Sequence, residues 1–352
     1  MSKLLTEKNH RTKTLLSPLI FLLLCALPAA LAGCRHDNVA GAPAATAASS
    51  EQFSVALLTP GPISDAGWNA AAFDGLQLIK NGLGAQTAMV QTTSPADFED
   101  AMRDFASRGF RVVFAHGFEY TDTALKVGKS FPKTYFIVTS GSGSSDNVAS
   151  VTFKIEEAAY VEGVLAGKLT KSGVVGCVGG IELPAIHLTF NGFRKGLLSV
   201  RPDGRVLTSF TGSFDDVGAA KEAALAQISQ GADLLFHNAD AAGLGVFQAA
   251  HQKGIYAFGA NRNQNDIIPD TVLASAVTDI PHAFLNLAKQ IKSGNFHPAM
   301  IELGMRDGEV KVVYNPELKG KISPDALAAA QLAEQGIEAG KIDVTSAARE
   351  MK

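Results

Sequence analysis

Short apolar runs rich in β-branched residues alternate with amphipathic helical stretches along most of this chain. Near-continuous apolar strands separated by helices are typical of parallel sheets that helices cover on both faces. The runs that we expect to be strands are FSVALLT (53–59), AQTAMVQT (85–92), RVVFAHG (111–117), TYFIVTSG (134–141), ASVTF (149–153), GVVGCVGG (173–180), RVLTSFTG (205–212), ADLLFHNA (232–239), GIYAFGA (254–260) and VLASAV (272–277). The alternation therefore predicts an α/β fold.

This pattern occurs twice, first over about 53–153 and again from the run that begins at 173. Two doubly wound parallel sheets form two lobes with a ligand cleft between them, and such lobes close about a hinge. We assign 53–155 to an N-terminal lobe, to which part of 275–300 returns. The C-terminal lobe takes 156–274 and part of 300–345.

Near the end of the chain, IELGMRDGEVKVVYN has Asp307-Gly308 at its centre, flanked by Arg306 and Glu309. An Asp-Gly pair between apolar runs is typical of a tight hairpin turn. We therefore expect a β-hairpin here.

The amino-terminal segment indicates an exported protein. Four cationic residues precede LLSPLIFLLLCALPAALAG, a stretch that contains prolines and is barely long enough to span a bilayer, so we interpret 1–33 as a signal peptide. The final Leu-Ala-Gly-Cys resembles the lipobox of bacterial lipoproteins, which implies cleavage before Cys34 and its lipidation; the alternative is an ordinary signal with a chance cysteine. Residues 34–52, rich in Ala, Ser and Gly, predict a flexible tether. We expect a lipid anchor in a bacterial membrane, with the protein facing the periplasm or the cell surface.

Charge and cysteine content exclude several classes of partner. The formal charge of −3 includes four cations and one acid in the signal peptide, so the mature chain carries −6, which argues against binding to nucleic acid. Cys177 is the one cysteine that remains after Cys25 is removed and Cys34 is lipidated, which leaves no internal disulfide and no cysteine metal site. The histidines show no metal-ligand spacing, and we expect no cofactor.

The turn SDAGWN, between the first strand and the first helix, holds the chain's single tryptophan, Trp68. Ser64 or Asp65 is a suitable N-cap for the following helix. The carboxyl end of a parallel strand is also where α/β proteins bind small molecules, so the turn has two interpretations, a helix start and one wall of a ligand site.

From 147 to 270 the chain resembles the basic membrane protein family of ABC-transporter substrate-binding lipoproteins, which includes purine-nucleoside receptors. NVASVTFKIEEAAYVEGVLAGKLTKSGVVGCVGG, SFDDVGAAKEAALAQISQGADLLF and GLGVFQAAHQKGIYAFGANRNQNDIIPD carry the resemblance, and SDAGWNAAAFDGL and AHGFEYTDTALKVGKSFP extend it upstream. The resemblance implies a type 1 periplasmic-binding-protein fold. It also implies a small ligand that the protein passes to an ABC permease without changing it chemically.

In the nucleoside receptors of this family, the base stacks between aromatic rings, one acid reads its polar edge, and another acid with a lysine holds the ribose. Aromatic faces suit such stacking because they bind flat rings at little entropic cost. Carried over to this chain, the resemblance implies the ligand-binding residues Ser64, Asp65, Trp68, Asn69, His116, Gly117, Phe118, Ser140, Phe190 and Asn261, to which we add Asp240. Whether Trp68 or Phe73 stacks on the ligand stays open.

Three positions depart from the family pattern. Ser140 and Asn261 stand where the family has acids, and Thr278 stands where it has lysine. Serine and asparagine offer different donors and acceptors from a carboxylate, so the ligand carries over less well than the scaffold. Asp240 is a candidate for the missing carboxylate.

We therefore expect a monomeric solute-binding protein that captures a purine nucleoside, a nucleobase or a related heterocycle by hinge closure. One alternative is a receptor for another ligand, such as a flavin or a sugar, and another is a surface lipoprotein without a transport role. An enzyme, such as a hydrolase using Asp65, Asp240 and a histidine, is not expected because no nucleophile motif is present.

Overall fold

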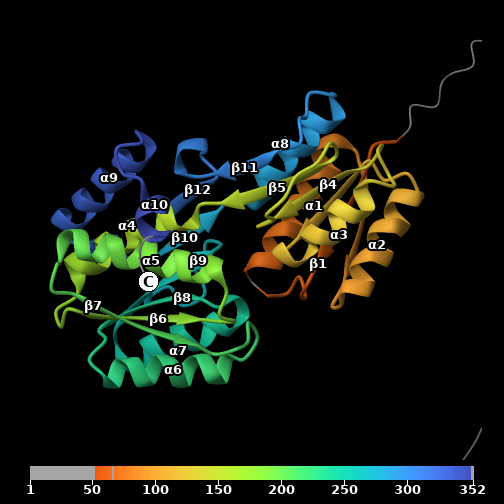
Figure 1. The fold of residues 1–352 in the computed structure, drawn as a ribbon. Helices are drawn as coiled ribbons and strands as arrows, with labels where there is room; N and C mark the ends of the chain where they lie inside the picture. Colours follow the sequence, from red (N-terminus) through yellow and green to blue (C-terminus); the bar gives the residue numbers. More distant parts are fainter. Residues whose placement is uncertain (1–51, 66, 350–352) are drawn as a thin grey trace, which may run out of the picture. The chain divides into compact units, whose positions relative to one another are not determined.

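Two six-stranded sheets form within residues 52–65 and 67–349, the part of the chain that the computed structural model describes (Figure 1). The strand order is β11–β5–β4–β3–β1–β2 in the first sheet and β12–β10–β9–β8–β6–β7 in the second. The first sheet contains β1 (Ser54–Thr59), β2 (Gln86–Gln91), β3 (Val112–His116), β4 (Tyr135–Thr139), β5 (Val148–Phe153) and β11 (Met300–Leu303). The second contains β6 (Val174–Gly179), β7 (Arg205–Phe210), β8 (Leu234–Asn238), β9 (Tyr256–Asn261), β10 (Val272–Thr278) and β12 (Val310–Tyr314).

Both sheets have the doubly wound topology that the sequence predicts. Neighbouring strands pair in parallel throughout the described residues, except that β12 runs antiparallel to β10. The first strand of each set, β1 or β6, lies inside its sheet, and the strands that follow it in sequence lie on both sides. Each of the ten expected strands is present, which confirms the α/β prediction.

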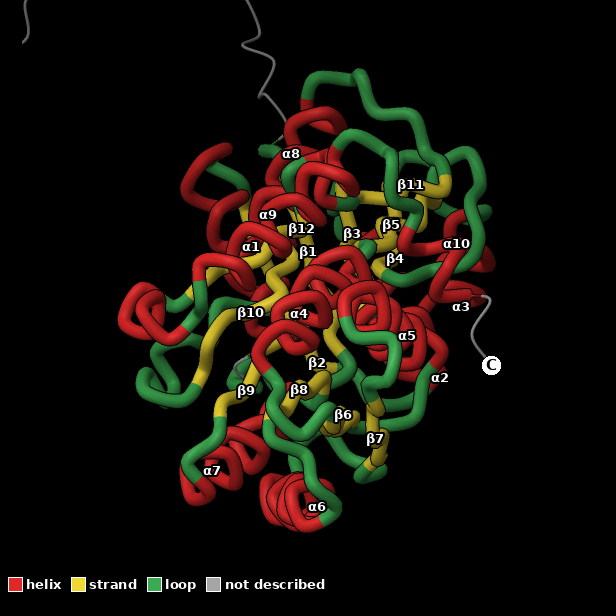
Figure 2. Tube along the Cα trace, turned by 90° about the vertical axis from the view of Figure 1, so that its left-hand side faces the viewer, coloured by secondary structure: helices red, strands yellow, loops and turns green. Residues whose placement is uncertain are grey.

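Helices cover both faces of each sheet because successive strand residues point to opposite sides. In β1, Val55 and Leu57 belong to one buried cluster, whereas Ala56 and Leu58 belong to another. Around the second sheet, α4 and α5 lie on one face and α6 and α7 on the other (Figure 2). The helices are α1 (Trp68–Leu83), α2 (Pro95–Ser107), α3 (Thr121–Gly128), α4 (Ile155–Leu169), α5 (Pro184–Val200), α6 (Val217–Ser229), α7 (Gly243–Lys253), α8 (Ile280–Lys292), α9 (Pro324–Glu338) and α10 (Val344–Arg349), with short 3₁₀ turns η1 (Phe118–Tyr120), η2 (Asp240–Ala242), η3 (Met305–Asp307) and η4 (Pro316–Lys321).

We call the first sheet with α1, α2, α3 and α8 the first lobe, and the second sheet with the remaining helices the second lobe; both belong to one compact unit. Within the described residues the chain passes between the lobes at Lys154, at Asp279 and over 304–309. The crossings lie side by side: Lys154 N donates to the carbonyl of Leu303, the residue before the third crossing (2.8 Å), and Asp279 N donates to the carbonyl of Glu309 within it (2.7 Å).

The expected hairpin around Asp307-Gly308 is wrong. β11 pairs with β5 in the first sheet, whereas β12 pairs with β10 in the second, so the two strands never face each other. The residues between them form η3 and end at Gly308, which adopts left-handed backbone (φ 77°). Asp307-Gly308 does form a tight turn, but this turn lies where the chain crosses from the first lobe to the second.

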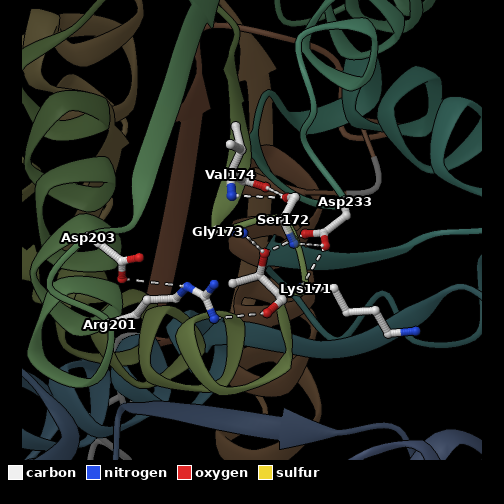
Figure 3. Close-up of polar contacts among 8 residues, drawn as sticks. Lys171, Ser172, Gly173, Val174, Arg201, Asp203 and Asp233 are labelled. Carbon is white, nitrogen blue, oxygen red and sulfur yellow. Dashed lines mark hydrogen bonds and ion pairs between the residues drawn. The ribbon is translucent and has the colours of Figure 1, made fainter.

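The amino edge of the second sheet is held by a polar cluster on the turn between α4 and β6 (Figure 3). The Asp233 carboxylate accepts hydrogen bonds from the Thr170 hydroxyl (2.6 Å) and from the backbone amides of Lys171 (2.7 Å) and Ser172 (2.8 Å). Arg201 donates to the Thr170 carbonyl from the other side (3.2 Å). This cluster ties a turn in place at the edge opposite to the strand ends discussed below.

No helix among residues 52–349, apart from the gap at 66, is long and apolar enough to cross a membrane. The predicted signal peptide, Cys34 and most of the tether lie outside the described residues.

Candidate functional site

The turn between β1 and α1 is organised by Asp65, which is buried. One carboxylate oxygen accepts from the amides of Gly67 (3.0 Å) and Ala70 (2.9 Å), and the other accepts from the amide and the side-chain nitrogen of Asn69 (2.7 and 2.9 Å). A carboxylate at a helix N-terminus satisfies amides that have no partner within the helix. The N-cap of α1 is Gly67, so neither Ser64 nor Asp65 is the N-cap that the sequence predicts. The Asp65 carboxylate nevertheless holds the amides of this turn, and its lone pairs are occupied by them.

Asn69 keeps one buried acceptor free. Its side chain is 7% exposed, and its nitrogen is committed to Asp65, which fixes the orientation of the amide. The remaining oxygen, Oδ1, has no hydrogen-bond partner among the described residues. An unpaired buried carbonyl costs about 1–3 kcal/mol, so this oxygen suits a donor from a bound molecule.

Trp68 stacks on His116, with ring centroids 4.2 Å apart. His116 is fully buried at the end of β3; its Nε2 lies 3.0 Å from the Trp68 carbonyl oxygen and its Nδ1 lies 2.9 Å from the Thr139 hydroxyl. Because a carbonyl only accepts, Nε2 carries the proton and Nδ1 accepts from Thr139. Burial lowers the pKa of His116 to about 3, so the ring is neutral and holds the tryptophan turn.

The opposite lobe contributes Asp240, which follows β8. Its Oδ1 accepts from the Trp68 amide of the first lobe (3.2 Å) and from the Asn261 side-chain nitrogen (2.9 Å). Burial, and next the charge of Asp65, raise the pKa of Asp240 to about 7. A carboxyl of the second lobe thus reaches the first lobe directly at the tryptophan turn.

Asn261, at the end of β9, is held from two sides. Its side-chain nitrogen also donates to Asn238 Oδ1 (3.3 Å), and Asn238 in turn donates to the Thr189 hydroxyl (3.4 Å). The Thr278 hydroxyl donates to the Asn261 carbonyl (3.1 Å). Thr278 therefore helps to hold the backbone of Asn261.

Three of the predicted site residues share an unusual backbone. Ser140, Asp240 and Asn261 have φ angles of 55°, 46° and 67°, and no other residue with a side chain has positive φ in the described part of the chain. Left-handed backbone costs a side-chain-bearing residue about 1–2 kcal/mol, and such strain gathers at binding sites. All three follow or end strands at the carboxyl edges of the two sheets. The strained positions among the described residues thus coincide with the edge at which the sequence predicts the site.

The other predicted residues occupy different surroundings. Ser64 is exposed, Gly117 is buried after β3, and the Phe118 ring is 53% exposed beside it. Phe190 is 3% exposed and packs against Phe210 and Phe236 in the core of the second lobe, with ring centroids 6.0 and 5.7 Å away. The structure thus places Phe190 in the core of the second lobe, and its stacking on a ligand stays a prediction.

Several residues at this edge were not singled out from the sequence. Asn238 and Thr189 join the Asn261 network, and Arg262 forms an ion pair across the lobes with Asp74 of α1 (2.8 Å). Arg262 directly follows the predicted Asn261, and Asn238 ends β8 two residues before Asp240; their places at strand ends are the signal that could have identified them. Thr189 lies within α5 and reaches the network only through folding.

Residues 52–340 match the family described as "ABC transporter substrate-binding protein PnrA-like". The chain belongs to this family. Among curated relatives, a purine-binding protein of Brucella abortus is 31% identical over 265 residues, which cover 74% of this chain and 75% of that protein. Basic membrane protein A of Borreliella burgdorferi is 26% identical over 76% of this chain and 81% of its own length. The resemblance seen in the sequence is confirmed.

Solved structures agree on the fold of this family member. An ABC transporter solute-binding protein from Conexibacter woesei superposes with a TM-score of 0.70 at 26% identity, over 83% of this chain and 98% of that one. A second, from Aeropyrum pernix, gives a TM-score of 0.75 at 21% identity, over 83% and 92% of the two chains. The periplasmic-binding-protein fold is thereby confirmed.

Proposed function

We propose that this chain is the solute-binding component of an ABC importer and that it binds a purine base, a purine nucleoside or a related heterocycle between its lobes. The main support is that Asn69, Asp240 and Asn261 lie together at the turn that holds Trp68. These residues come from the carboxyl edges of both sheets. The purine-binding name of the Brucella relative supports the ligand class.

The chemistry at this edge suits a flat heterocycle. Trp68 and the exposed Phe118 ring offer apolar aromatic faces, for which stacking of a base contributes about 1–3 kcal/mol. The unpaired Asn69 Oδ1 can accept one N–H donor, and Ser140 offers a hydroxyl at the position where the family has an acid. A purine presents both a flat face and N–H donors at its edge.

Delivery follows from closure of the lobes. A ligand that contacts both lobes stabilises the closed form by its differential affinity for that form, and the permease then recognises it. We propose that the protein performs no reaction on the ligand, requires no cofactor and acts as a monomer. Lipidation at Cys34 would hold it at a bacterial membrane, within reach of the permease.

Native mass spectrometry of the chain from about residue 36, followed by denaturation and identification of any released molecule, tests this proposal. Thermal shifts are measured in parallel with adenine, adenosine, guanine, guanosine, riboflavin and glucose. A ligand at 100 times its dissociation constant adds about 2.7 kcal/mol, which raises the melting temperature by about 5 °C for a domain of this size. Stabilisation by a purine base or nucleoside is the expected result; stabilisation by riboflavin or glucose alone, or by none of them, contradicts the purine assignment.

A site variant and a matched control locate the binding. Asn69→Leu removes the free acceptor and should weaken binding of the stabilising purine at least tenfold. Asp233→Asn, at the opposite edge of the second sheet, should lower the melting temperature without changing that affinity. Equal losses of affinity in the two variants would place the ligand elsewhere.

A further inference from the structure

The two lobes meet on one carboxyl group. Besides accepting from the Trp68 amide, Asp240 Oδ1 lies so near Gly67 that a β-carbon there would come within 2.5 Å of it. The residue as a whole is half-buried, but its carboxyl faces the first lobe. Opening the lobes would therefore return this carboxyl to water.

The charged groups around Asp240 oppose its ionisation. From the first lobe it faces the Asp65 carboxylate, and from its own lobe Asp215, on the loop before α6. Arg262, which follows Asn261, is paired with Asp74. The favourable contacts are the hydrogen bonds from Trp68 and Asn261, which offset only part of the cost of burial.

The nearby histidines stay neutral between pH 6 and 8. Burial lowers the pKa of His116 to about 3 and that of His237, beneath the Asp240 turn, to about 4. His237 Nδ1 accepts from the Ala239 amide (3.3 Å), and its Nε2 lies 3.0 Å from Gln264 Oε1, so it positions this turn without titrating.

We propose that closing the lobes takes up a proton at Asp240, so that the closed form is favoured as the pH falls from 8 to 6. The inference rests on the proposed function only in taking the lobes to open and close. A solvated aspartate has a pKa of about 3.9, whereas burial and Asp65 raise that of Asp240 to about 7 in the closed contact. The form that binds more protons gains as pH falls, by about tenfold in the closing constant between pH 8 and pH 6.

The single tryptophan reports this contact directly, because Trp68 donates its amide to Asp240. Acrylamide quenching of tryptophan emission is measured from pH 6 to pH 8 on the full chain in detergent. For the wild-type chain, we expect quenching to increase with pH as the lobes open. Asp240→Asn, neutral at every pH, should show low and constant quenching, and Asp266→Asn, an exposed carboxyl of the same lobe, should follow the wild type.

Quenching of the wild type that does not change with pH, or an unchanged profile in Asp240→Asn, overturns the proposal. Asp240→Ser, checked for folding by circular dichroism, replaces the asparagine variant if that variant does not fold.

Titrations with adenine and adenosine at pH 6 and pH 8 should show about tenfold tighter binding at pH 6 in the wild type and in Asp266→Asn, but not in Asp240→Asn. If neither purine binds at either pH, the proposed function fails, while the quenching profile still decides whether closure takes up a proton.

Discussion

Left-handed backbone at Ser140, Asp240 and Asn261 costs stability at three residues of the candidate site. Asparagine and aspartate tolerate positive φ better than most residues because their short polar side chains form local hydrogen bonds, whereas serine has less of this advantage. Asn261 and Asp240 are also bonded to each other. Ser140 is held by its backbone, through the amide that donates to the Val151 carbonyl (2.7 Å). The least compensated strain therefore lies at Ser140.

Ser140→Gly should raise the free energy of unfolding by about 0.5–1 kcal/mol, because glycine adopts this backbone without steric cost. The gain is smaller than the full strain because glycine also has more freedom in the unfolded chain. Urea denaturation measures the change. Ser144→Gly, at an exposed position with ordinary backbone, should instead lower stability, and a loss in both variants would argue against stored strain at Ser140.

Glu162 is a second residue that lowers stability, in this case as a buried carboxyl group without hydrogen-bond partners of ordinary geometry. It is fully buried on α4, and neither carboxyl oxygen has a hydrogen bond of ordinary geometry, although the backbone of Ala276 lies close enough to offset part of the cost. Burial raises the pKa of Glu162 well above its usual range. The protonated form is therefore the one that the core tolerates.

Glu162→Gln should stabilise the protein increasingly as the pH rises. A group whose pKa is raised by folding keeps its full stability below its unfolded pKa, near 4.3, and loses stability as the pH rises through the folded value. Each unit of the raised pKa costs about 1.4 kcal/mol at alkaline pH. Denaturation at pH 5 and pH 8 measures the difference between variant and wild type, and Glu222→Gln, at an exposed position, is the control. A gain that is the same at both pH values would contradict a titrating Glu162.

Among the elements, α4 and α5 approach each other through glycine. A β-carbon at Gly163 would collide with the Phe193 carbonyl oxygen, and one at Gly196 would collide with the Tyr160 carbonyl oxygen. Backbone atoms cannot move aside as the end of a side chain can, so both positions need a residue without a side chain. The packing of this helix pair thus depends on the spacing of small residues in two helices.

Gly196→Ala should lower the free energy of unfolding by about 2 kcal/mol, because an overfilled contact forces the helices apart. Gly82→Ala is the matched control in a helix, since its β-carbon would meet Leu285 at an ordinary 3.6 Å. Alanine is the better helix former by about 1 kcal/mol, so the control should be neutral or stabilising. Thermal unfolding that ranks the two variants in the reverse order would show that α4 and α5 can separate at low cost.

Sequence reasoning was accurate for elements whose signal is local. The signal of the buried strands is local because a buried parallel strand is apolar along most of its length, as in SVALLT and VVFAH. The failed hairpin shows the limit, since Asp307-Gly308 encodes a turn but not the sheet that each flanking strand joins. At the candidate site, the family resemblance pointed to Asn261 and its missing carboxylate pointed to Asp240, whereas Thr189 depends on contacts between distant segments.

At the scale of the whole molecule, the lobes are joined by hydrogen-bonded crossings and also meet at the candidate site. The crossings at Lys154 and Asp279 bond to the segment 303–309. The contacts at the site are the Asp240–Trp68 hydrogen bond and the Arg262–Asp74 ion pair. The contact between the lobes at this edge therefore includes a few polar contacts of modest strength, which a bound ligand would supplement under the proposed function.

Reversing one charge of the Arg262–Asp74 pair should open the lobes, and exchanging both charges should close them again. Arg262→Glu places two carboxylates together and should lower the closing constant about fivefold, since partly exposed pairs contribute up to about 1 kcal/mol. Asp74→Arg combined with Arg262→Glu restores an attractive pair with the charges exchanged. Acrylamide quenching of Trp68 at pH 6 should therefore increase in the single variant and return toward the wild-type value in the double variant. At 1 M salt the difference should shrink, because exposed charges are then screened within about 3 Å. A double variant quenched as strongly as the single one would show that Arg262 acts through its shape and not through charge across the lobes.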